Sequence, residues 1–377
     1  MVNVRFFVVL LLAVLAAYAT GGCDRAPIAP PKRAPESPAE RVLVVINERS
    51  TSSDTIGRYY VQRRGIDSTH VLRVSLPETD EVGELEFQSN LVAPVRAAIT
   101  ALPVRIDFIL LTPGVPIRVA RKNGYSVDAL LAGMNLPIPP MVGLDSVWLG
   151  RYRNPYFNAS GPFDSDRYGM YLVTRLACYR LDDCRALVDR AMRATPARGP
   201  FFFDAAPRRP ATDGYTATNE GLYRGAAWLQ RMGANVQIDS AAAFVAPRTP
   251  VMGYVSWGSN DNRFDSTAYH AIRFLPGALA ETFVSTSART FGPTVGGQSR
   301  IVDLIEQGVT GVKGYVSEPY TVALADPTIL FDRYLRGATL AEAFYAASRM
   351  VQWKDLVVGD PLCAPYAPTA PTGPRVP

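Results

Sequence analysis

Two runs of almost wholly apolar residues, Val42–Ile46 and Ile106–Leu111, restrict the fold of this chain more than any other feature. A strand without polar alternation is covered on both faces, as in a parallel sheet. The segments 54–64 and 84–102 carry apolar residues at helical spacing, although Pro94 is expected to kink or break the second. This βαβαβ order predicts a right-handed, mainly parallel α/β sheet flanked by helices.

The same alternation of strands and helices continues to residue 366. Further strands are expected at Val71–Val74, Met170–Arg175, Pro200–Asp204, near Val236, and at Gly253–Ser256, Gly311–Ser317 and Leu356–Val358. Further helices are expected at 182–194, 218–232, 298–307, 327–335 and 340–350. We divide these elements between two related α/β subdomains, 41–198 and 199–366. Between residues 118 and 161 the periodicity disappears, and the aromatic residues there either line a groove or pack the loop onto the domain.

The first 23 residues have the features of an export signal. Arg5 precedes the apolar run Phe6–Ala17, which is too short to span a membrane comfortably. Gly22 and Cys23 follow as in a bacterial lipobox, in which Cys23 would be lipidated, while cleavage after Ala19 is the alternative. We therefore expect an exported lipoprotein, attached to a membrane of the cell envelope by its N-terminal lipid and facing the periplasm or the exterior.

The charge pattern and the number of histidines argue against a nucleic-acid partner and a histidine metal site. The net charge of +5 comes from scattered Lys and Arg, so no nucleic-acid partner is expected. Two histidines, His70 and His270, exclude a multi-histidine metal site, and no cofactor is expected. Residues 24–40 are rich in Pro and Ala and suit a linker, whereas residues 367–377 suit a disordered tail.

The cysteines leave two arrangements open. If Cys23 carries a lipid, Cys178, Cys184 and Cys363 remain, and export makes disulfides possible. Cys178 and Cys184 enclose five residues and could close a small loop, which would leave Cys363 as a buried free thiol. Three buried thiols without a bridge are equally compatible with the sequence.

Polar residues gather where the strands of the second half end. Ligands of open α/β sheets bind at the carboxyl ends of strands. The stretches Gly253–Asp261 and Phe283–Thr290, one helix apart, carry hydroxyl, amide and carboxylate groups at such positions. The residues expected at the strand ends are Asp204, Ser256, Ser259, Asn260, Asp261, Ser285, Ser287, Arg289, Glu318 and Asp360.

The order of these motifs resembles that of the gingipain-type cysteine peptidases and the caspase-like CHAT domains. In those proteins a Tyr-x-Gly-His-Gly strand end carries the catalytic His, and the next strand end carries the catalytic Cys. Tyr254–Gly258 is similar to the first motif, Val284–Ser287 to the second, and Gly359–Pro361 to a closing Gly-Asp-Pro. The resemblance covers about residues 41–366 and implies a caspase/gingipain-like α/β fold. Through segments such as Thr112–Pro116 the chain also resembles an uncharacterised family of exported bacterial proteins, which implies no activity.

Both catalytic positions of the peptidases carry other residues here. Trp257 stands at the His position, and an indole has no basic nitrogen. Ser285 or Ser287 stands at the Cys position, and a hydroxyl without a neighbouring base is a weak nucleophile. The cysteine-peptidase mechanism therefore does not transfer to this chain.

Three functions remain open on the residues alone. The first is a non-catalytic module that binds a peptide or another envelope ligand through Ser256, Trp257, Ser259, Asn260, Asp261 and Arg289. The second is a serine-type hydrolase that uses Ser285 or Ser287, with a base among Asp261, Glu318, Lys313 and His270. The third is a metal-assisted hydrolase that uses Asp261 and Glu318. We favour the first because it requires no chemistry that the sequence lacks, although the carboxylates could equally cap helices and Trp257 could fill a cavity.

Overall fold

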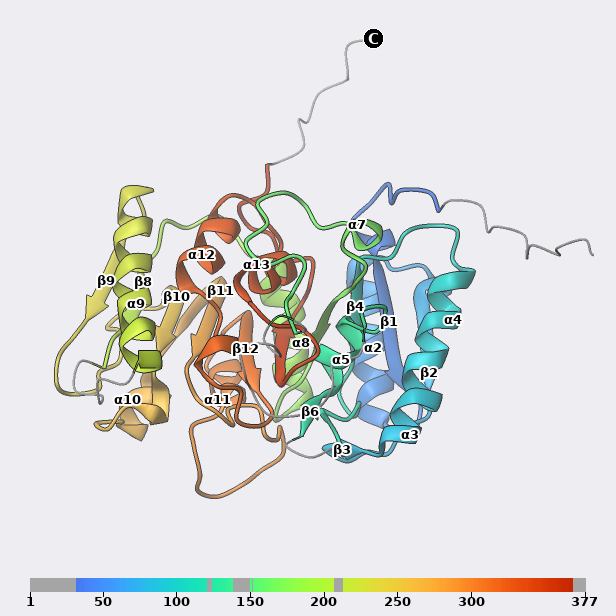
Figure 1. Ribbon diagram of the computed structural model, residues 1–377, viewed down its shortest axis with the longest axis horizontal. Helices are drawn as coiled ribbons and strands as arrows, with labels where there is room; N and C mark the ends of the chain where they lie inside the picture. The colour runs from blue at the N-terminus through green and yellow to red at the C-terminus, as the bar shows by residue number, and fades with distance from the viewer. Residues whose placement is uncertain (1–31, 121–123, 138–149, 151, 207–212, 369–377) are drawn as a thin grey trace, which may run out of the picture. The chain divides into compact units, whose positions relative to one another are not determined.

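A ten-stranded sheet lies between two layers of helices (Figure 1). Its strands are β1 (Val42–Asn47), β2 (Val71–Val74), β4 (Phe108–Leu111), β7 (Leu172–Arg175), β8 (Phe201–Asp204), β9 (Val236–Asp239), β10 (Val251–Ser256), β11 (Phe274–Thr282), β12 (Gly311–Tyr315) and β13 (Asp355–Gly359). They are ordered β2-β1-β4-β7-β13-β12-β11-β10-β8-β9 across the sheet. This computed structural model describes residues 32–120, 124–137, 150, 152–206 and 213–368. Residues 34–377 belong to one unit, and the first 33 residues to another.

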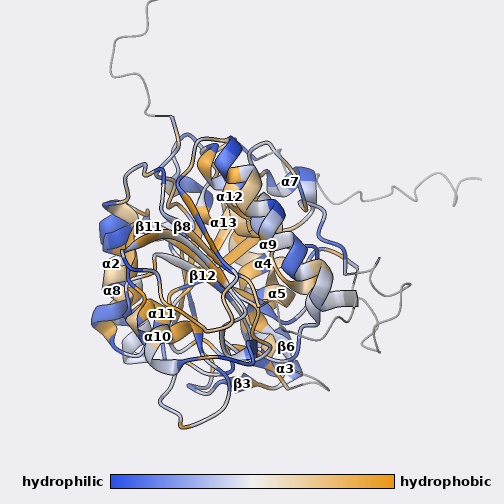
Figure 2. Cartoon of the chain, turned by 90° about the vertical axis from the view of Figure 1, so that its left-hand side faces the viewer, coloured by the Kyte–Doolittle hydropathy of each residue, from blue (hydrophilic) through white to orange (hydrophobic). Residues whose placement is uncertain are grey.

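Helices cover both faces of the sheet. Figure 2 shows this in a view from the left-hand side of Figure 1. One face carries α2 (Thr51–Arg64), α8 (Leu181–Met192), α10 (Ser266–Ala271) and α11 (Ile301–Glu306). The other carries α4 (Ala93–Ala101), α5 (Val127–Ala132), α9 (Asp213–Arg231), α12 (Pro327–Leu335) and α13 (Leu340–Ala347). Every residue of β1, β4, β7, β8 and β10 is buried, as expected for strands covered on both sides. The predicted α/β fold with a mainly parallel sheet is confirmed.

The strands of the two halves of the chain meet at β7 and β13, which pair in parallel at Arg175 and Val358. The sheet is therefore continuous across the boundary that we expected between two subdomains. Its antiparallel pair joins β12 to β13, with Gly311 opposite Gly359. Because β13 runs against β12, Asp360 lies beside the start of β12. The expectation that Asp360 joins the polar residues at the carboxyl ends of the second-half strands is wrong for this reason.

Local chemistry explains two helix boundaries that differ from the expectation. Helix α2 begins at Thr51, earlier than the expected residue 54, because the Ser50 side chain accepts the capping bond from the Ser53 N–H. A π-helical stretch at Gln88–Val92 separates α3 (Glu84–Phe87) from α4. It directly precedes the first turn of α4, where Pro94 has no N–H to donate, so the expected break lies there.

The connection after β4 packs onto the domain through its aromatic rings. It contains β5 (Arg118–Val119) and β6 (Tyr125–Ser126), which form a small sheet with β3 (Glu81–Val82). The rings of Tyr125 and Tyr152 lie edge-on to Trp353, with centroids 5.4 and 4.8 Å away. Residues 138–149 and 151 of this connection lie outside the described part of the chain.

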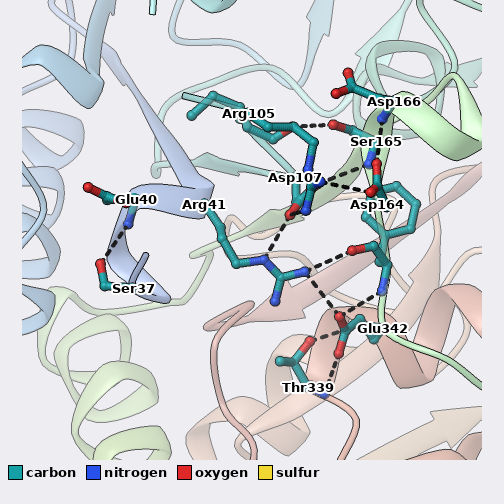
Figure 3. Close-up of polar contacts among 12 residues, drawn as sticks. Ser37, Glu40, Arg41, Arg105, Asp107, Asp164, Ser165, Asp166, Thr339 and Glu342 are labelled. Carbon is teal, nitrogen blue, oxygen red and sulfur yellow. Dashed lines mark hydrogen bonds and ion pairs between the residues drawn. The ribbon is translucent and has the colours of Figure 1, made fainter. Parts of the chain in front are cut away.

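An ion-pair cluster joins the first strand to the last helix of the fold (Figure 3). The Arg41 guanidinium, at the start of β1, donates to Asp107 at 2.8 Å and to Glu342 of α13 at 3.2 Å. Arg105 adds a second pairing to Asp107 and reaches Asp164 at 2.7 Å, just before α7 (Ser165–Tyr168). Segments some 300 residues apart are fixed to each other at this edge of the sheet.

Candidate functional site

The two polar stretches that the sequence singles out follow neighbouring strands. Strands β10 and β11 are parallel, with Ser256 opposite Thr282. The residues just beyond these strand ends, Trp257 and Phe283, place their ring centroids 5.3 Å apart. The predicted adjacency of the two strand ends is confirmed, although Phe283–Thr290 forms the turn after β11 and not part of a strand.

Trp257 is buried at the end of β10, at 1% exposure. Its indole Nε1 donates a hydrogen bond of 2.8 Å to Asn219 Oδ1 on α9. The Tyr215 and Phe283 rings lie edge-on to the indole at 5.5 and 5.3 Å. Because indole nitrogen is a donor and has no basic lone pair, this position can anchor and pack but cannot accept a proton.

The polar residues next to Trp257 hold the loops together. The Ser256 hydroxyl accepts a bond from the Gly258 N–H at 3.0 Å. Ser259 and Ser299 exchange two bonds, of 3.1 and 2.8 Å, between backbone N–H groups and hydroxyls. The Asn260 amide donates to the Phe283 carbonyl at 2.7 Å and accepts from the Gln298 amide at 2.9 Å. These bonds join the loop after β10 to the loop after β11.

Two adjoining pockets form a groove at these strand ends. The larger, which we call the tryptophan pocket, has a volume of about 490 Å³ and is lined by residues that include Tyr215, Trp257, Asn260, Ser285, Glu318 and Tyr320. The smaller, the arginine pocket, has a volume of about 260 Å³ and is lined by residues that include Thr218, Arg224, Asp326 and Arg349. Both are lined by Gly214, Phe283, Thr321 and Leu324, so they are continuous.

The structure separates the two candidate nucleophiles. Ser287 is 1% exposed, and its hydroxyl accepts a bond from the Tyr315 N–H at 3.2 Å, so it supports β12. Ser285 is half-buried on the wall of the tryptophan pocket. Within the described ranges, no side chain or backbone group is hydrogen-bonded to the Ser285 hydroxyl. Ser285 is thus accessible, but among the described residues no base is hydrogen-bonded to it.

The candidate bases point elsewhere. Lys313 is fully buried, donates to the Ala323 carbonyl at 2.7 Å, and pairs with Asp355 at 3.2 Å. His270 is on the exposed side of α10, where its ring bonds to the Ser266 carbonyl, and it does not line either pocket. Both side chains are committed to structural contacts away from Ser285.

The charged residues Asp261, Glu318 and Arg289 also support the loops. Asp261 accepts from the Arg263 N–H at 2.7 Å, and Glu318 accepts from the Tyr320 N–H at 3.0 Å. Arg289 donates to the carbonyls of three loop residues, Thr286, Gln298 and Gly296. Glu318 lines the tryptophan pocket, whereas Asp261 does not. In the part of the chain that the structure describes, no three His, Cys, Asp or Glu side chains gather so as to hold a metal ion.

Tyr320, on the pocket wall, has a backbone conformation that residues other than Gly rarely adopt, with φ 60° and ψ 159°. The preceding residues are held firmly. Trp353 Nε1 donates to the Pro319 carbonyl at 2.9 Å, and Lys354 Nζ donates to the Glu318 carbonyl at 2.8 Å. The Tyr320 side chain remains 51% exposed. Nothing in the sequence marks Tyr320 as unusual, because a backbone angle has no signature in the residue type.

A buried polar network supports the wall that the two pockets share. Glu281, fully buried on β11, accepts bonds from the Tyr315 hydroxyl and from the Ala325 N–H. Burial raises the pKa of the Glu281 carboxyl to about 7, although Lys313 and the Tyr315 hydroxyl act to lower it. Through Ala325 and the Lys313 bond to Ala323, this network fixes the segment 321–325. In the sequence, an isolated Glu within an apolar stretch is the one signal of this network.

Asp204, at the end of β8, is 2% exposed. Burial raises the pKa of its carboxyl to about 8, and the negative charges of Asp261 and Asp239 raise it further. One carboxyl oxygen of Asp204 has no hydrogen-bond partner among the described residues. The sequence correctly placed Asp204 at a strand end, but the residue does not line the groove.

The cysteines are arranged as one bridge and one free thiol in the described chain. Cys178 and Cys184 form a disulfide at the start of α8, with Cα atoms 5.5 Å apart. Cys363 is buried and free. Cys23, the residue expected to carry a lipid, lies outside the described residues. Among the helices of the described ranges, none combines the length and the apolar character needed to span a membrane.

Comparison with known proteins gives matches to solved structures. No protein-family model matches this chain, and no curated protein matches it. The chain is similar to "Complex of Porphyromonas gingivalis RgpB pro- and mature domains", with 11% identity, a TM-score of 0.48, and coverage of 86% of this chain and 79% of that chain. It is also similar to "Structure of Protease", with 11% identity, a TM-score of 0.50, and coverage of 87% and 79%. At such identities the likeness concerns the fold alone, a large and mostly parallel sheet flanked by helices.

Proposed function

We propose that this chain is an exported, lipid-anchored protein of gingipain-like fold that binds an extended peptide in the groove without cleaving it. One observation carries the proposal. Trp257 lies buried against Asn219 where the resemblance requires a catalytic His, and the accessible Ser285 has no base among its described neighbours. The position therefore retains a pocket, and among the described residues no base is hydrogen-bonded to its serine.

The construction of the groove favours binding. Its walls come from the turn after β11, the loop after β12 and helix α9, and the bonds of Asn260, Gln298 and Arg289 fix the first of these. The strained backbone of Tyr320 holds an aromatic side chain at the pocket rim. A wall that is rigid before a ligand arrives loses less conformational entropy on binding. Aromatic rings beside hydroxyl and amide groups suit the alternating apolar and polar character of a peptide.

A serine-type hydrolase is the second candidate, and the exposure of Ser285 in the pocket is the observation that favours it. Fluorophosphonate labelling of the full-length protein separates the two. We expect no labelling that depends on Ser285, judged by comparing the wild type with Ser285→Ala and Ser287→Ala. Labelling that disappears in the Ser285→Ala variant would establish a reactive serine and overturn the binding proposal.

Blocking the pocket tests binding directly. Ser285→Trp should fill the tryptophan pocket without breaking a described hydrogen bond, and Ser89→Trp adds the same side chain at an exposed site on the π-helical stretch before α4. We expect the Ser285→Trp variant to lose at least about tenfold in affinity for peptides selected from a random hexapeptide library, and the control to keep it. Equal affinities of the two variants would remove the groove from the proposal. A sugar polymer that competes where no peptide does would replace the peptide as ligand.

The lipid anchor rests on the sequence around Cys23. Labelling growing cells with an alkyne fatty acid should mark the wild type and leave the Cys23→Ser variant unmarked. Mass spectrometry of the mature N-terminus would then identify the lipid on Cys23. A mature chain that begins at Thr20 without lipid would support the alternative cleavage after Ala19.

A further inference from the structure

The arginine pocket contains a cation, Arg349, that is ion-paired with none of the described carboxylates. Arg349 follows α13, is exposed, and places its guanidinium carbon 4.7 Å from the centre of the Phe157 ring. Among the described residues no carboxylate is paired with it. Its carbonyl accepts the Asn154 N–H at 3.0 Å, which fixes the backbone. A guanidinium that is oriented by a ring and has no anion beside it is ready to bind one.

A second arginine and the surrounding carboxylates reinforce this polarity. Arg224 of α9 lines the same pocket and pairs only loosely with the exposed Glu220, at 3.5 Å. Asp326 also lines the pocket, but its carboxylate caps α12 by accepting the Thr328 and Ile329 N–H groups. Its charge is partly offset by the helix start that it caps. The pocket therefore favours an anion.

The opposite end of the groove has the opposite sign. Glu318 lines the tryptophan pocket with its side chain exposed, and none of the described Lys and Arg residues lines that pocket. Gly214 marks the passage between the two pockets, since a Cβ built there would meet the Thr321 hydroxyl at 2.7 Å. A ligand that fills both pockets must therefore be slender at this point and carry its negative charge at the arginine end.

We propose that the groove selects peptides that place a carboxylate in the arginine pocket, between Arg349 and Arg224. This inference rests on the proposed peptide binding and adds the class of peptide. Arg and carboxylate form charge-assisted hydrogen bonds, frequently two in parallel, which an amide of the same shape does not reproduce. The carboxylate can come from a Glu or Asp side chain or from the C-terminus of a peptide.

Matched peptides test the charge. A single Glu is moved through the six positions of Ser/Ala hexapeptides that are acetylated and amidated, and each peptide has a Gln twin. A third series of unsubstituted peptides keeps a free C-terminal acid. By fluorescence anisotropy with the full-length protein, we expect at least one Glu peptide or one free acid to bind about tenfold more tightly than its neutral twin. The series that shows the preference identifies the source of the carboxylate.

Arginine variants locate the preference. Arg349→Gln should lower the affinity for the preferred acidic peptide about tenfold and change the affinity for its neutral twin by less than about twofold. Arg224→Gln should lower the affinity for the acidic peptide in the same way but to a smaller extent. Arg185→Gln, which removes a half-exposed arginine of α8 on the other face of the sheet, is the control and should change neither affinity. Equal binding of every acidic peptide and its twin overturns the inference while peptide binding stands. A preference that persists in an Arg224→Gln/Arg349→Gln double variant overturns it as well, and failure of every peptide to bind the wild type removes both proposals.

Discussion

The indole of Trp257 is hydrogen-bonded to Asn219 Oδ1 at 2.8 Å, which ties the end of β10 to the middle of α9. Asn219 also donates to the Ala206 carbonyl at 3.0 Å and accepts from the Ala206 N–H at 3.3 Å, so it connects two strand ends to one helix. The large ring is thus part of the scaffold that surrounds the groove. Substitutions at this position should be read first as changes in stability and only then as changes in binding.

Trp257→Phe removes the donor and part of the ring. We expect the free energy of unfolding to fall by about 1–3 kcal/mol, because the half-buried Asn219 Oδ1 loses one of its two donors and a small cavity forms. Urea unfolding measures the change. In a double-mutant cycle with Asn219→Ala, the coupling should be about 1 kcal/mol, and additive effects of the two substitutions would show that the bond contributes nothing.

Tyr320→Gly should stabilise the folded protein and at the same time weaken peptide binding in the groove. Gly adopts φ 60°, ψ 159° without the strain that Tyr320 bears, so relief of strain should raise the free energy of unfolding by about 1–3 kcal/mol. The lost packing of the Tyr320 side chain offsets part of this gain. Tyr320→Ala removes the same ring but keeps the strain, which makes it the matched comparison. Thermal unfolding should rank Gly above Ala, and both variants should lose peptide affinity. If Ala is as stable as Gly, the backbone at this position is not strained.

Glu281 should make stability depend on pH between about 4.5 and 7. Its pKa is about 7 in the folded chain and 4.5 as an ordinary carboxyl, so the folded state binds the proton more tightly. The corresponding stabilisation is complete below pH 4.5 and is lost as the pH rises through 7, by about 3 kcal/mol in total. Glu281→Gln should flatten this part of the profile in urea titrations. Glu318→Gln, at an exposed site, is the control and should leave the profile unchanged.

Asp204→Asn should stabilise the protein most strongly at alkaline pH. The pKa of Asp204 is raised from 3.8 to about 8, so the folded state progressively loses stability as the pH rises from about 4 to 8 and the buried carboxyl ionises. An amide avoids this cost, and we expect a higher midpoint of thermal unfolding at pH 9 and little change at pH 4. Asp261→Asn should lower the pKa of Asp204, since it removes one neighbouring negative charge. The pH range over which stability falls should then end below about pH 8. A Tm difference between Asp204→Asn and wild type that is the same at pH 4 and pH 9 would contradict the assignment.

Of the cysteines at 178, 184 and 363, two should form a disulfide and the third should be a thiol that reagents do not reach. In the Cys23→Ser variant, a thiol reagent should find no reactive cysteine in the native protein and one after denaturation without reductant. Cys363 would be that thiol, because burial raises its pKa to about 12 and the thiolate is the reactive form. Peptide mapping should recover Cys178 and Cys184 linked to each other. Three thiols in the denatured chain would show that the bridge does not form.

The sequence predicted most strands of the sheet, because buried strands carry a direct signal, but β11 (Phe274–Thr282) was not among the expected strands. The apolar runs at Val42–Ile46 and Ile106–Leu111 correspond to β1 and β4, and the polar stretches after β10 and β11 are neighbours as expected. The direction of β13 was also not predicted. A short terminal strand such as β13 looks the same in sequence whichever way it runs, so the position of Asp360 could not be inferred.

The sequence predicted that these polar stretches lie next to each other, but it did not distinguish the roles of their residues. Hydroxyl, amide and carboxylate groups near a strand end can bind a ligand or bind neighbouring loops, and residue type does not distinguish the two. In the structure Ser256, Ser259 and Ser287 are used for loop bonds, whereas Ser285 is left on the pocket wall. The arginine pocket was missed, because Arg224 and Arg349 lie 125 positions apart on separate elements.

By itself the sequence determined that this is an α/β protein with polar groups at the ends of central strands, and that Trp257, whose indole has no basic nitrogen, stands among them. Those conclusions follow from local periodicity and side-chain chemistry, which a sequence carries directly. The tertiary structure alone decided which side chains face the groove, that Tyr320 is strained, and that Glu281 is buried beside Lys313. Such properties arise when segments far apart in the chain exclude water from one another and compete for the same hydrogen bonds, and no single segment encodes them.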